Sequence, residues 1–512
     1  MGGSKFGRLA GSAAFILFGT VVSMGLSFGI RVVLARLLGS DGYGVVVLGF
    51  TVATLVAIVA KSGLPRGVAR ELPRRESESE RRDVALSGLT LGLCLGSGLG
   101  VLLYAFSPLI TTRVFDDQRL TFVLQAFSFI VPFIVIRSIA VSIFRGYNRT
   151  GERVLLNNFL APVARFVLIV SAVALGYEVG GAAVAWVIGA GITAIAALVL
   201  LHRRIGVFVR DGYEPQHRSL LAFSLPLMLS AAIWNVVQQA DNLLLGYFST
   251  ASIVGQYDIA FTLAKLLLAV ITAFGFLFMP IFSELHAEEN AEAMNRFYNV
   301  TAKWAASLAF PLYLVALLFP ATILSTAFGP EYASADGVLR IISTGFFFHI
   351  LSGLSGNALI AIGRTRTILL CNLAIVALNT SLNVALIPAY GIEGAAIASA
   401  ISYSGLNLLY IRTLRKYDVF PFSLPTLAPL GITGVLVLLP WLILRPEVIG
   451  EPLGVVLFIA LTAVIYLPVY VLSGGVQRAD VEVLVDVENS VGRRFPRMKR
   501  LLVTASERGY SR

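Results

Sequence analysis

The chain has 512 residues, of which 57% are hydrophobic and only 13% charged, and its formal net charge is +11. Soluble domains carry about 25% charged residues, so this composition excludes an ordinary water-soluble enzyme. The basic residues lie in short connections between apolar runs, which indicates orientation in a membrane and no nucleic-acid partner. The two cysteines, Cys94 and Cys371, lie far apart within apolar runs. Such isolated cysteines make no metal site, and the sequence predicts no metal and no cofactor.

The apolar runs are about 20 residues long, which is the length a helix needs to cross ~30 Å of hydrocarbon. Backbone groups in lipid must be satisfied internally, so each run is predicted to be a helix of an all-α integral membrane protein. In chain order the fourteen predicted spans are 13–35, 43–60, 84–106, 120–144, 153–176, 180–202, 219–247, 254–283, 301–327, 338–362, 367–388, 391–411, 425–444 and 452–473.

The distribution of lysine and arginine orients these spans. With the N-terminus inside, the inner segments hold 31 of the 40 basic residues if Arg153 and Lys303, at the inner starts of two spans, are counted with them; the outer loops hold 4, and the other 5 lie within spans. Positive loops stay in the cytoplasm, so this bias predicts that both termini are cytoplasmic and that the chain crosses the plasma membrane many times. A missed helix would scramble the alternation beyond the error.

The chain also repeats itself. Gly181-Ala182-Ala183 opens the sixth span and Gly394-Ala395-Ala396 opens the twelfth, with an offset of 213 residues. The pair Gly42-Tyr43 and the segment Gly255-Gln256-Tyr257 show the same offset at the second and eighth spans. Chance similarity between Gly/Ala-rich helices is the alternative.

We therefore predict two pseudo-symmetric six-helix bundles, related by an axis along the membrane normal, with a substrate cleft between them. The predicted organisation is an N-terminal lobe at 1–218, a C-terminal lobe at 219–418, helices thirteen and fourteen within 419–474, and a cytoplasmic tail at 475–512. The tail combines a helical spacing of apolar residues with a basic run, which is typical of a helix on an anionic membrane surface.

Cations inside the spans are the first candidates for a substrate site. Arg31, Arg137, Arg165 and Lys265 lie within apolar runs. Arg340 is close enough to a span end to reach the interface, and the same alternative stays open for Arg31 near the outer end of its span. Facing lipid, the four together would cost on the order of 10 kcal/mol, so we expect them to face a wet cavity or partners. Arginine binds phosphate well through its planar fork, so this excess of positive charge favours an anionic, phosphate-bearing substrate.

The seventh span adds a polar stripe to the candidates. Asn235, Gln238 and Asp241 lie along this span, among further Asn and Gln residues. Such side chains either line a cavity or hydrogen-bond neighbouring helices to one another. Asp241 has a third interpretation, as the counter-charge of a cation.

Four segments resemble a known family. The segment 35–44 (Ala-Arg-Leu-Leu-Gly-Ser-Asp-Gly-Tyr-Gly) is similar to the first-loop signature of polysaccharide-biosynthesis flippases. Ser224-Leu225-Pro226-Leu227, Gln239-Ala240-Asp241 and Val254-Gly255-Gln256-Tyr257 follow in the order typical of that family. The resemblance extends over residues 7–475 and places the chain in the multidrug/oligosaccharidyl-lipid/polysaccharide transporter superfamily.

The resemblance implies a fourteen-helix, two-lobed flippase without enzymatic activity. Such a protein moves a polyprenyl-(pyro)phosphate-linked oligosaccharide to the outer leaflet while the polyprenyl tail stays in lipid. Family members use cationic cavity residues for the acidic head, and Arg31, Arg137, Arg165 and Lys265 match these in kind. The implied partners are the lipid-linked anionic oligosaccharide, membrane lipids and glycan-assembly enzymes, and we expect a monomer.

Two other functions stay open at this point. A multidrug or cation exporter of the same superfamily usually has twelve spans and a coupling acid in its first half, whereas the first six spans here carry arginines and no deep acid. A membrane polysaccharide polymerase or glycosyltransferase usually exposes catalytic acids. Asp116 and Asp117 form the one carboxylate pair in the predicted outer loops, and we interpret them as a solvated turn.

Overall fold

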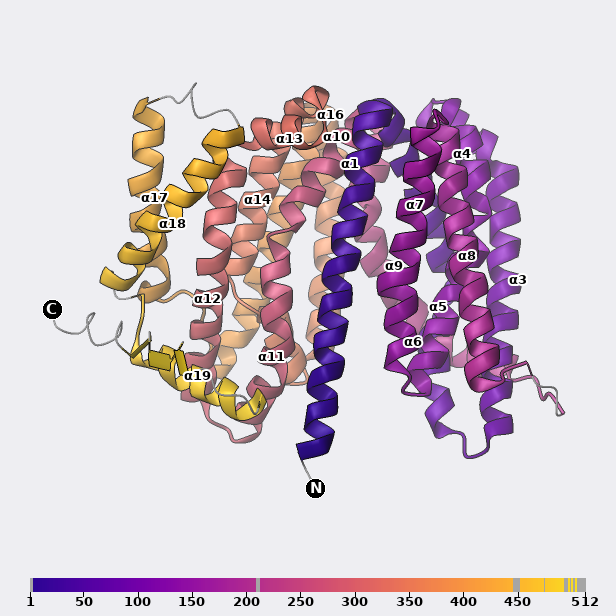
Figure 1. Ribbon diagram of the computed structural model, residues 1–512, viewed down its shortest axis with the longest axis horizontal. Helices are drawn as coiled ribbons and strands as arrows, with labels where there is room; N and C mark the ends of the chain where they lie inside the picture. The colour runs from indigo at the N-terminus through magenta and orange to yellow at the C-terminus, as the bar shows by residue number, and fades with distance from the viewer. Residues whose placement is uncertain are drawn as a thin grey trace. The chain divides into compact units, whose positions relative to one another are not determined.

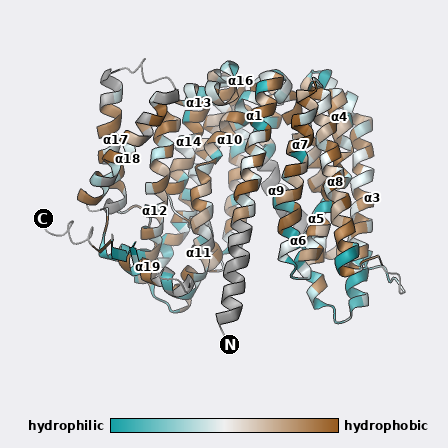
Figure 2. Cartoon of the chain, viewed as in Figure 1, coloured by the Kyte–Doolittle hydropathy of each residue, from teal (hydrophilic) through white to brown (hydrophobic). Residues whose placement is uncertain are grey.

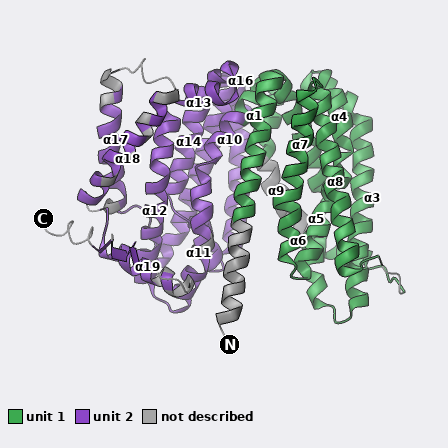
Figure 3. Cartoon of the chain, in the orientation of Figure 1, with its two compact units in different colours: residues 1–258 green, residues 259–512 purple. Residues whose placement is uncertain are grey.

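The computed structural model describes residues 3–208, 212–444, 452–473 and 475–491, together with the short tail segments 496–497, 499–500 and 502–503. Every regular element within these ranges is a helix (Figure 1). The chain forms two compact units, unit 1 at residues 1–258 and unit 2 at residues 259–512 (Figure 3). The repeat predicted a lobe boundary at 218/219, which stays a prediction because a compact unit need not coincide with a repeat.

Unit 1 consists of long helices joined by short turns. They are α1 (Gly3–Lys61), α2 (Leu64–Glu71), η1 (Leu72–Arg74), α3 (Glu78–Ile110), η2 (Thr111–Phe115), α4 (Arg119–Ser128), α5 (Ile130–Gly146), α6 (Thr150–Val154), η3 (Leu155–Leu160), α7 (Ala161–Ala174), α8 (Val179–Ile205), α9 (His217–Phe248) and the beginning of α10 (Ala251–Lys265). Hydrophilic residues gather at the lower ends of α3 and α8 in Figure 2, and apolar residues fill the middle of these helices.

Unit 2 also consists of helices joined by short connections. It contains the rest of α10, then α11 (Leu268–Ala287), α12 (Ala291–Leu318), α13 (Pro320–Phe328), η4 (Pro330–Ala335), α14 (Asp336–Leu351), α15 (Ser355–Ala361), α16 (Thr365–Leu414), η5 (Arg415–Tyr417), α17 (Leu424–Leu444), α18 (Pro452–Leu472) and α19 (Arg478–Val491). The core of one end of this unit is aromatic, with Phe278 stacked on both Phe282 and Phe297.

The helices confirm an all-α membrane protein that crosses the bilayer many times. Among the described residues, nine helices are long and apolar enough to span a membrane, and the bent pair α10–α11 makes a tenth if it is one span. Two of these helices each cover two predicted spans. α1 turns at Gly39 (φ 68°) and α16 turns at Gly391 (φ 57°). Only glycine adopts this left-handed conformation without a steric penalty, so each glycine lets the chain reverse without a loop. The total of fourteen is consistent with this arrangement.

After the turn at Gly39, α1 packs against the start of α10 at backbone distance. A Cβ atom on Gly44 would lie 1.7 Å from the carbonyl oxygen of Ala251, and one on Gly255 would lie 2.4 Å from that of Ser40. Both obstructing atoms belong to the backbone and cannot rotate away. Glycine is therefore required on both sides of this contact.

We expect Gly44→Ala to destabilise the protein by roughly 3 kcal/mol, because the new methyl group forces the two backbones apart. Gly98→Ala in α3 is the matched control, since a Cβ there meets no atom within 4 Å. Alanine should leave stability unchanged or raise it by about 0.5 kcal/mol at that position. Thermal unfolding in detergent measures both, and equal melting temperatures for the two variants would contradict the packing described.

The tail helix α19 is fixed to unit 2 by a buried ion pair. The Asp480 carboxylate accepts from Lys303 Nζ at 2.7 Å and from Trp304 Nε1 at 2.8 Å. The side chains of Lys303 and Asp480 are 2% and 1% exposed. Val483 and Leu484 are buried as well. The apolar face of α19 packs on protein at the ends of α11 and α12 (Figure 1). The predicted position of this helix at the inner membrane surface stays a prediction.

We expect Lys303→Ala to cost about 3–5 kcal/mol, because it leaves a buried carboxylate without its counter-ion. The double variant Lys303→Met/Asp480→Leu removes both charges and should be much less destabilised. Unfolding of the two variants in detergent makes the comparison. A double variant as unstable as the single one would show that the pair does not hold α19 through its charges.

Candidate functional site

The turn at Gly39 brings the two arms of α1 together around an acidic residue of α10. Arg31 precedes the turn and donates from Nη1 to the hydroxyl of Tyr43 at 2.8 Å. Arg31 also forms an ion pair with Asp258, and the Tyr43 hydroxyl donates to Asp258 Oδ2 at 2.5 Å. Tyr43 is buried, and the side chain of Asp258 is 12% exposed. We refer to Arg31, Tyr43 and Asp258 as the Arg31 network.

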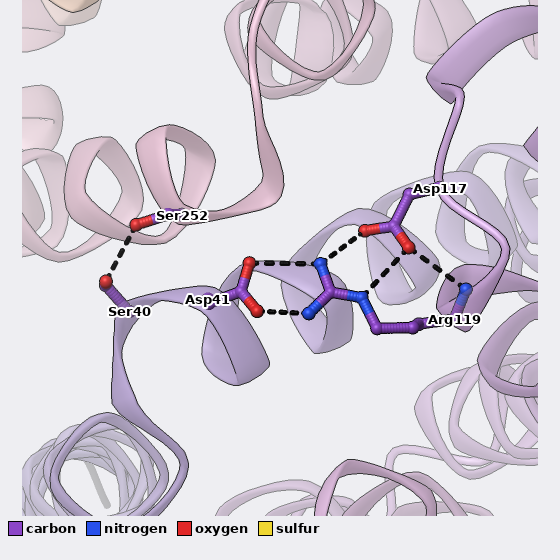
Figure 4. Close-up of polar contacts among 5 residues, drawn as sticks. All are labelled: Ser40, Asp41, Asp117, Arg119 and Ser252. Atoms are coloured by element: carbon purple, nitrogen blue, oxygen red, sulfur yellow. Dashed lines mark hydrogen bonds and ion pairs between the residues drawn. The ribbon is translucent and has the colours of Figure 1, made fainter.

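A second set of polar contacts lies beside the turn (Figure 4). The Ser40 and Ser252 hydroxyl oxygens are 2.8 Å apart and link α1 to α10. Arg119 donates from Nη2 to Asp41 Oδ1 at 3.1 Å and to Asp117 Oδ2 at 2.8 Å. Burial alone would raise the pKa of Asp117, but hydrogen bonds from Arg119 and its charge outweigh burial and lower that pKa. The Asp117 carboxylate is therefore charged at neutral pH and holds Arg119 against Asp41.

Elsewhere in unit 1, Arg137 has a basic residue of each of two other helices near it. Lys61 ends α1, Arg137 lies in α5 and Arg165 lies in α7. The charge of Arg137 acts on both Lys61 and Arg165. Within the described part of the chain, none of the three forms an ion pair with a carboxylate. We call Lys61, Arg137 and Arg165 the cation cluster.

Neutral groups hold the two arginines of the cation cluster in place. Arg137 donates from Nη1 to Asn157 Oδ1 at 3.0 Å. Arg165 donates from Nε to the carbonyl oxygen of Ala161 at 3.2 Å, and its guanidinium lies 5.9 Å from the ring centroid of Trp186. None of these partners neutralises charge. Like charges in the cluster therefore repel one another without compensation from these partners.

The side-chain amide that contacts Arg137 comes from a π-helix. The segment η3 adopts π geometry between α6 and α7, and it carries Asn157 and Asn158. Asn158 donates to Thr20 Oγ1 at 3.2 Å, while its neighbour Asn157 contacts Arg137. Single π turns inside α-helices are frequent at functional sites, because the extra residue re-aims the side chains that follow.

The substrate-binding residues predicted from the sequence do not form one site in the structure. Arg137 and Arg165 come together, whereas Arg31 belongs to the Arg31 network and is paired. Asp241 is buried and accepts from the Tyr257 hydroxyl at 2.6 Å. Lys265 lies in unit 2, with its ammonium 4.9 Å from the ring centroid of Phe261. The side chains of Asn235 and Gln238 lie outside the described residues.

Sequence reasoning missed three residues that the structure brings into these sites. Lys61 counted as a loop cation, although it ends a helix beside Arg137. Asp258 lies inside the predicted span 254–283, where a carboxylate is costly and therefore signals a function or a partner. Asn157 lacked any signal, because π geometry does not follow from the pattern of residues. The described residues contain no group of His, Cys, Asp or Glu side chains that could hold a metal ion.

Comparisons with known proteins match this chain to membrane transporters and flippases. The model of the family described as polysaccharide biosynthesis protein matches residues 9–286, and the MatE family model matches residues 226–385. The probable low-salt glycan biosynthesis flippase Agl15 of Haloferax volcanii is 26% identical over 440 residues, which cover 84% of this chain and 89% of the relative.

Two solved structures share the fold. The lipid II flippase MurJ in its inward closed conformation is 14% identical, with a TM-score of 0.70 over 89% of this chain and 97% of that one. A multidrug resistance MATE family transporter of the MOP superfamily, in its inward-facing conformation, is 17% identical, with a TM-score of 0.63 over 77% and 94% of the two chains. The first family model covers more than half of the chain, and the chain therefore belongs to the polysaccharide biosynthesis protein family.

Proposed function

We propose that this protein translocates a polyprenyl-(pyro)phosphate-linked oligosaccharide across the plasma membrane. The observation that carries the proposal is the cation cluster, in which Lys61, Arg137 and Arg165 have no carboxylate partner among the described residues. Unpaired cations within membrane helices are costly, roughly 3 kcal/mol each, and are kept where a function needs them. An acidic lipid head supplies the missing negative charge.

The names of the relatives support the same substrate class. Agl15 is described as a probable glycan biosynthesis flippase, and a putative O-antigen transporter of Shigella flexneri is 24% identical over 75% of this chain. The first name refers to a glycan and the second to the transport of O-antigen. We propose that this chain acts as a transporter without enzymatic activity, and that glycan-assembly enzymes supply its substrate.

The proposed mechanism is alternating access with both termini in the cytoplasm. In that orientation the turn at Gly39 lies on the outer side, and the Ser40–Ser252 contact joins α1 to α10 there. The acidic head enters from the cytoplasm and binds the cation cluster. The α1–α10 contact then opens, and the head leaves toward the outer leaflet while the polyprenyl tail stays in lipid.

Deleting the gene tests the proposal. We expect an oligosaccharide linked to a polyprenyl phosphate or pyrophosphate to accumulate on the cytoplasmic side, with the wild-type gene clearing it on re-expression. The alternative, export of cationic drugs, is favoured by the MatE match over residues 226–385. Loss of drug resistance on deletion, without any accumulated lipid-linked sugar, would support that alternative and refute the proposal.

A further inference from the structure

The Arg31 network joins α1 to α10 through a single carboxylate. Arg31 and Tyr43 belong to α1, one before and one after the turn at Gly39, and both contact Asp258 of α10. Closer to the turn, the same two helices also meet through a pair of serine hydroxyl groups (Figure 4). Asp258 is therefore the carboxylate that ties α10 to both arms of α1.

Arg31 uses only part of its guanidinium group in this network. Its Nη1 atom donates to both Tyr43 and Asp258. Among the described residues, no acceptor contacts Nε or Nη2, which carry three of the five N–H groups and form an edge that can bind a phosphate with two hydrogen bonds. The side chain of Arg31 is 35% exposed, whereas that of Asp258 is 12% exposed. A phosphate can therefore approach Arg31 while Asp258 is still in place.

A polar face of α1 leads from the cation cluster to Arg31. Four polar residues at intervals of three or four positions share this face, and they are Thr20, Ser23, Ser27 and Arg31. Thr20 accepts a hydrogen bond from Asn158 of η3, and the neighbouring Asn157 contacts Arg137 of the cation cluster. Thr20 and Arg31 are 11 positions apart, or about 17 Å along the helix. Hydroxyl groups therefore line the way from the cluster to the Arg31 network.

We infer that Asp258 occupies Arg31 in place of the acidic lipid head and that the head displaces it during transport. This inference rests on the proposed function. The phosphate first binds the open edge of Arg31 and then replaces the carboxylate on Nη1. A phosphate competes well for this position, because its oxygens match the planar fork of a guanidinium group. The Tyr43 hydroxyl still donates to Asp258, so the carboxylate keeps one partner when Arg31 leaves it.

This exchange couples the substrate to the contact between α1 and α10. A ligand shifts a conformational equilibrium only if it binds one state better than the other. Both N–H groups of Nη1 are engaged while α10 is in place, so the head binds Arg31 more fully once Asp258 has moved away. When the head leaves, Asp258 returns to Arg31 and the contact closes. The protein without substrate therefore stays closed at this end of α1.

The test measures how readily the α1–α10 contact opens in the purified full-length protein in detergent. In the parent protein for this test, Cys94 and Cys371 are replaced by serine, and Ser40→Cys introduces a thiol at a position that is only 8% exposed. A water-soluble maleimide labels this thiol when the contact opens. We expect polyprenyl pyrophosphate to raise the rate of labelling about fivefold and a neutral polyprenol to leave the rate unchanged.

Three further variants are made in this parent protein. Asp258→Asn removes the competing charge and should label about fivefold faster without lipid, with no further increase when polyprenyl pyrophosphate is added. Arg31→Lys keeps the ion pair but loses the fork, so it should label slowly and respond weakly to the lipid. Asp117→Asn is the matched control and should behave like the parent, because Asp117 is also paired with an arginine, Arg119 at 2.8 Å, and is 16% exposed.

A labelling rate that polyprenyl pyrophosphate does not change in the parent, or that Asp258→Asn does not raise, would overturn the inference. If Asp258→Asn does not fold, a full fivefold response of Arg31→Lys would overturn it instead. Translocation of a lipid-linked sugar by the wild type in vesicles is measured in parallel. Translocation without a labelling response leaves the proposed function standing and refutes only the role of Asp258. Absence of both translocation and lipid-dependent labelling refutes the proposed function, and the role of Asp258 with it.

Discussion

The double variant Arg137→Ala/Arg165→Ala is expected to lose export of the lipid-linked glycan, with a fall of roughly 100-fold or more. Each guanidinium has further N–H groups beside the one that donates to Asn157 or to Ala161. Charge-assisted hydrogen bonds from these groups to an acidic head contribute about 1.5–3 kcal/mol each. Export is measured as surface glycan in a deletion strain that expresses the variant. Arg137→Lys/Arg165→Lys keeps the charge without the planar fork and should retain an intermediate activity.

The same double variant should unfold at a higher temperature than the wild type. Arg137 lies near both Arg165 and Lys61, and neither arginine has a carboxylate partner among the described residues, so removing the two arginines relieves repulsion within the membrane. Arg340→Ala is the matched control, because this arginine also belongs to an apolar helix but pairs with Asp336 at 3.0 Å. It should export normally. An inactive variant that is also unstable would point to misfolding and contradict the role in substrate binding.

The second large effect concerns the contact between α1 and α10. Ser40→Cys/Ser252→Cys should form a disulfide under oxidising conditions, since the two hydroxyl oxygens are only 2.8 Å apart. The experiment starts from a protein in which Cys94 and Cys371 are replaced by serine. If the outer side must open for release, the crosslinked protein should stop exporting glycan, and a reductant should restore export.

Each single cysteine variant is the control for this experiment and should respond to neither oxidant nor reductant. The extent of crosslinking is followed by the shift of a proteolytic fragment on a gel. Full crosslinking with undiminished export would show that the α1–α10 contact does not open during transport. The alternating-access mechanism proposed here would then be wrong in its outer half.

The sequence predicted the helices better than their connections. Apolar runs of about 20 residues leave helix as the only spanning structure, so the membrane class followed directly. The spans at 13–35 and 43–60 form one continuous element in the structure, because Gly39 supplies a left-handed turn within it. A glycine between two apolar runs does not by itself distinguish such a turn from a loop.

The candidate site was predicted in part. Arg137 and Arg165 stood out because charge is rare at membrane depth, and the structure brings them together. Arg31 stood out for the same reason but pairs with Asp258, which is 227 residues away in the chain. Pairing over such a distance depends on tertiary packing. The sequence did not predict Lys61 as a site residue, because a lysine at a helix end usually only orients the membrane span.

Transport by purified protein in vesicles tests the central claim most directly. Two substrates are compared that carry the same oligosaccharide and the same polyprenyl chain, one linked through pyrophosphate and the other through a neutral glycosidic bond. If Lys61, Arg137 and Arg165 recognise the acidic head, the wild-type protein should translocate the pyrophosphate-linked lipid and leave the neutral one where it was added. Equal translocation of both lipids would contradict the account.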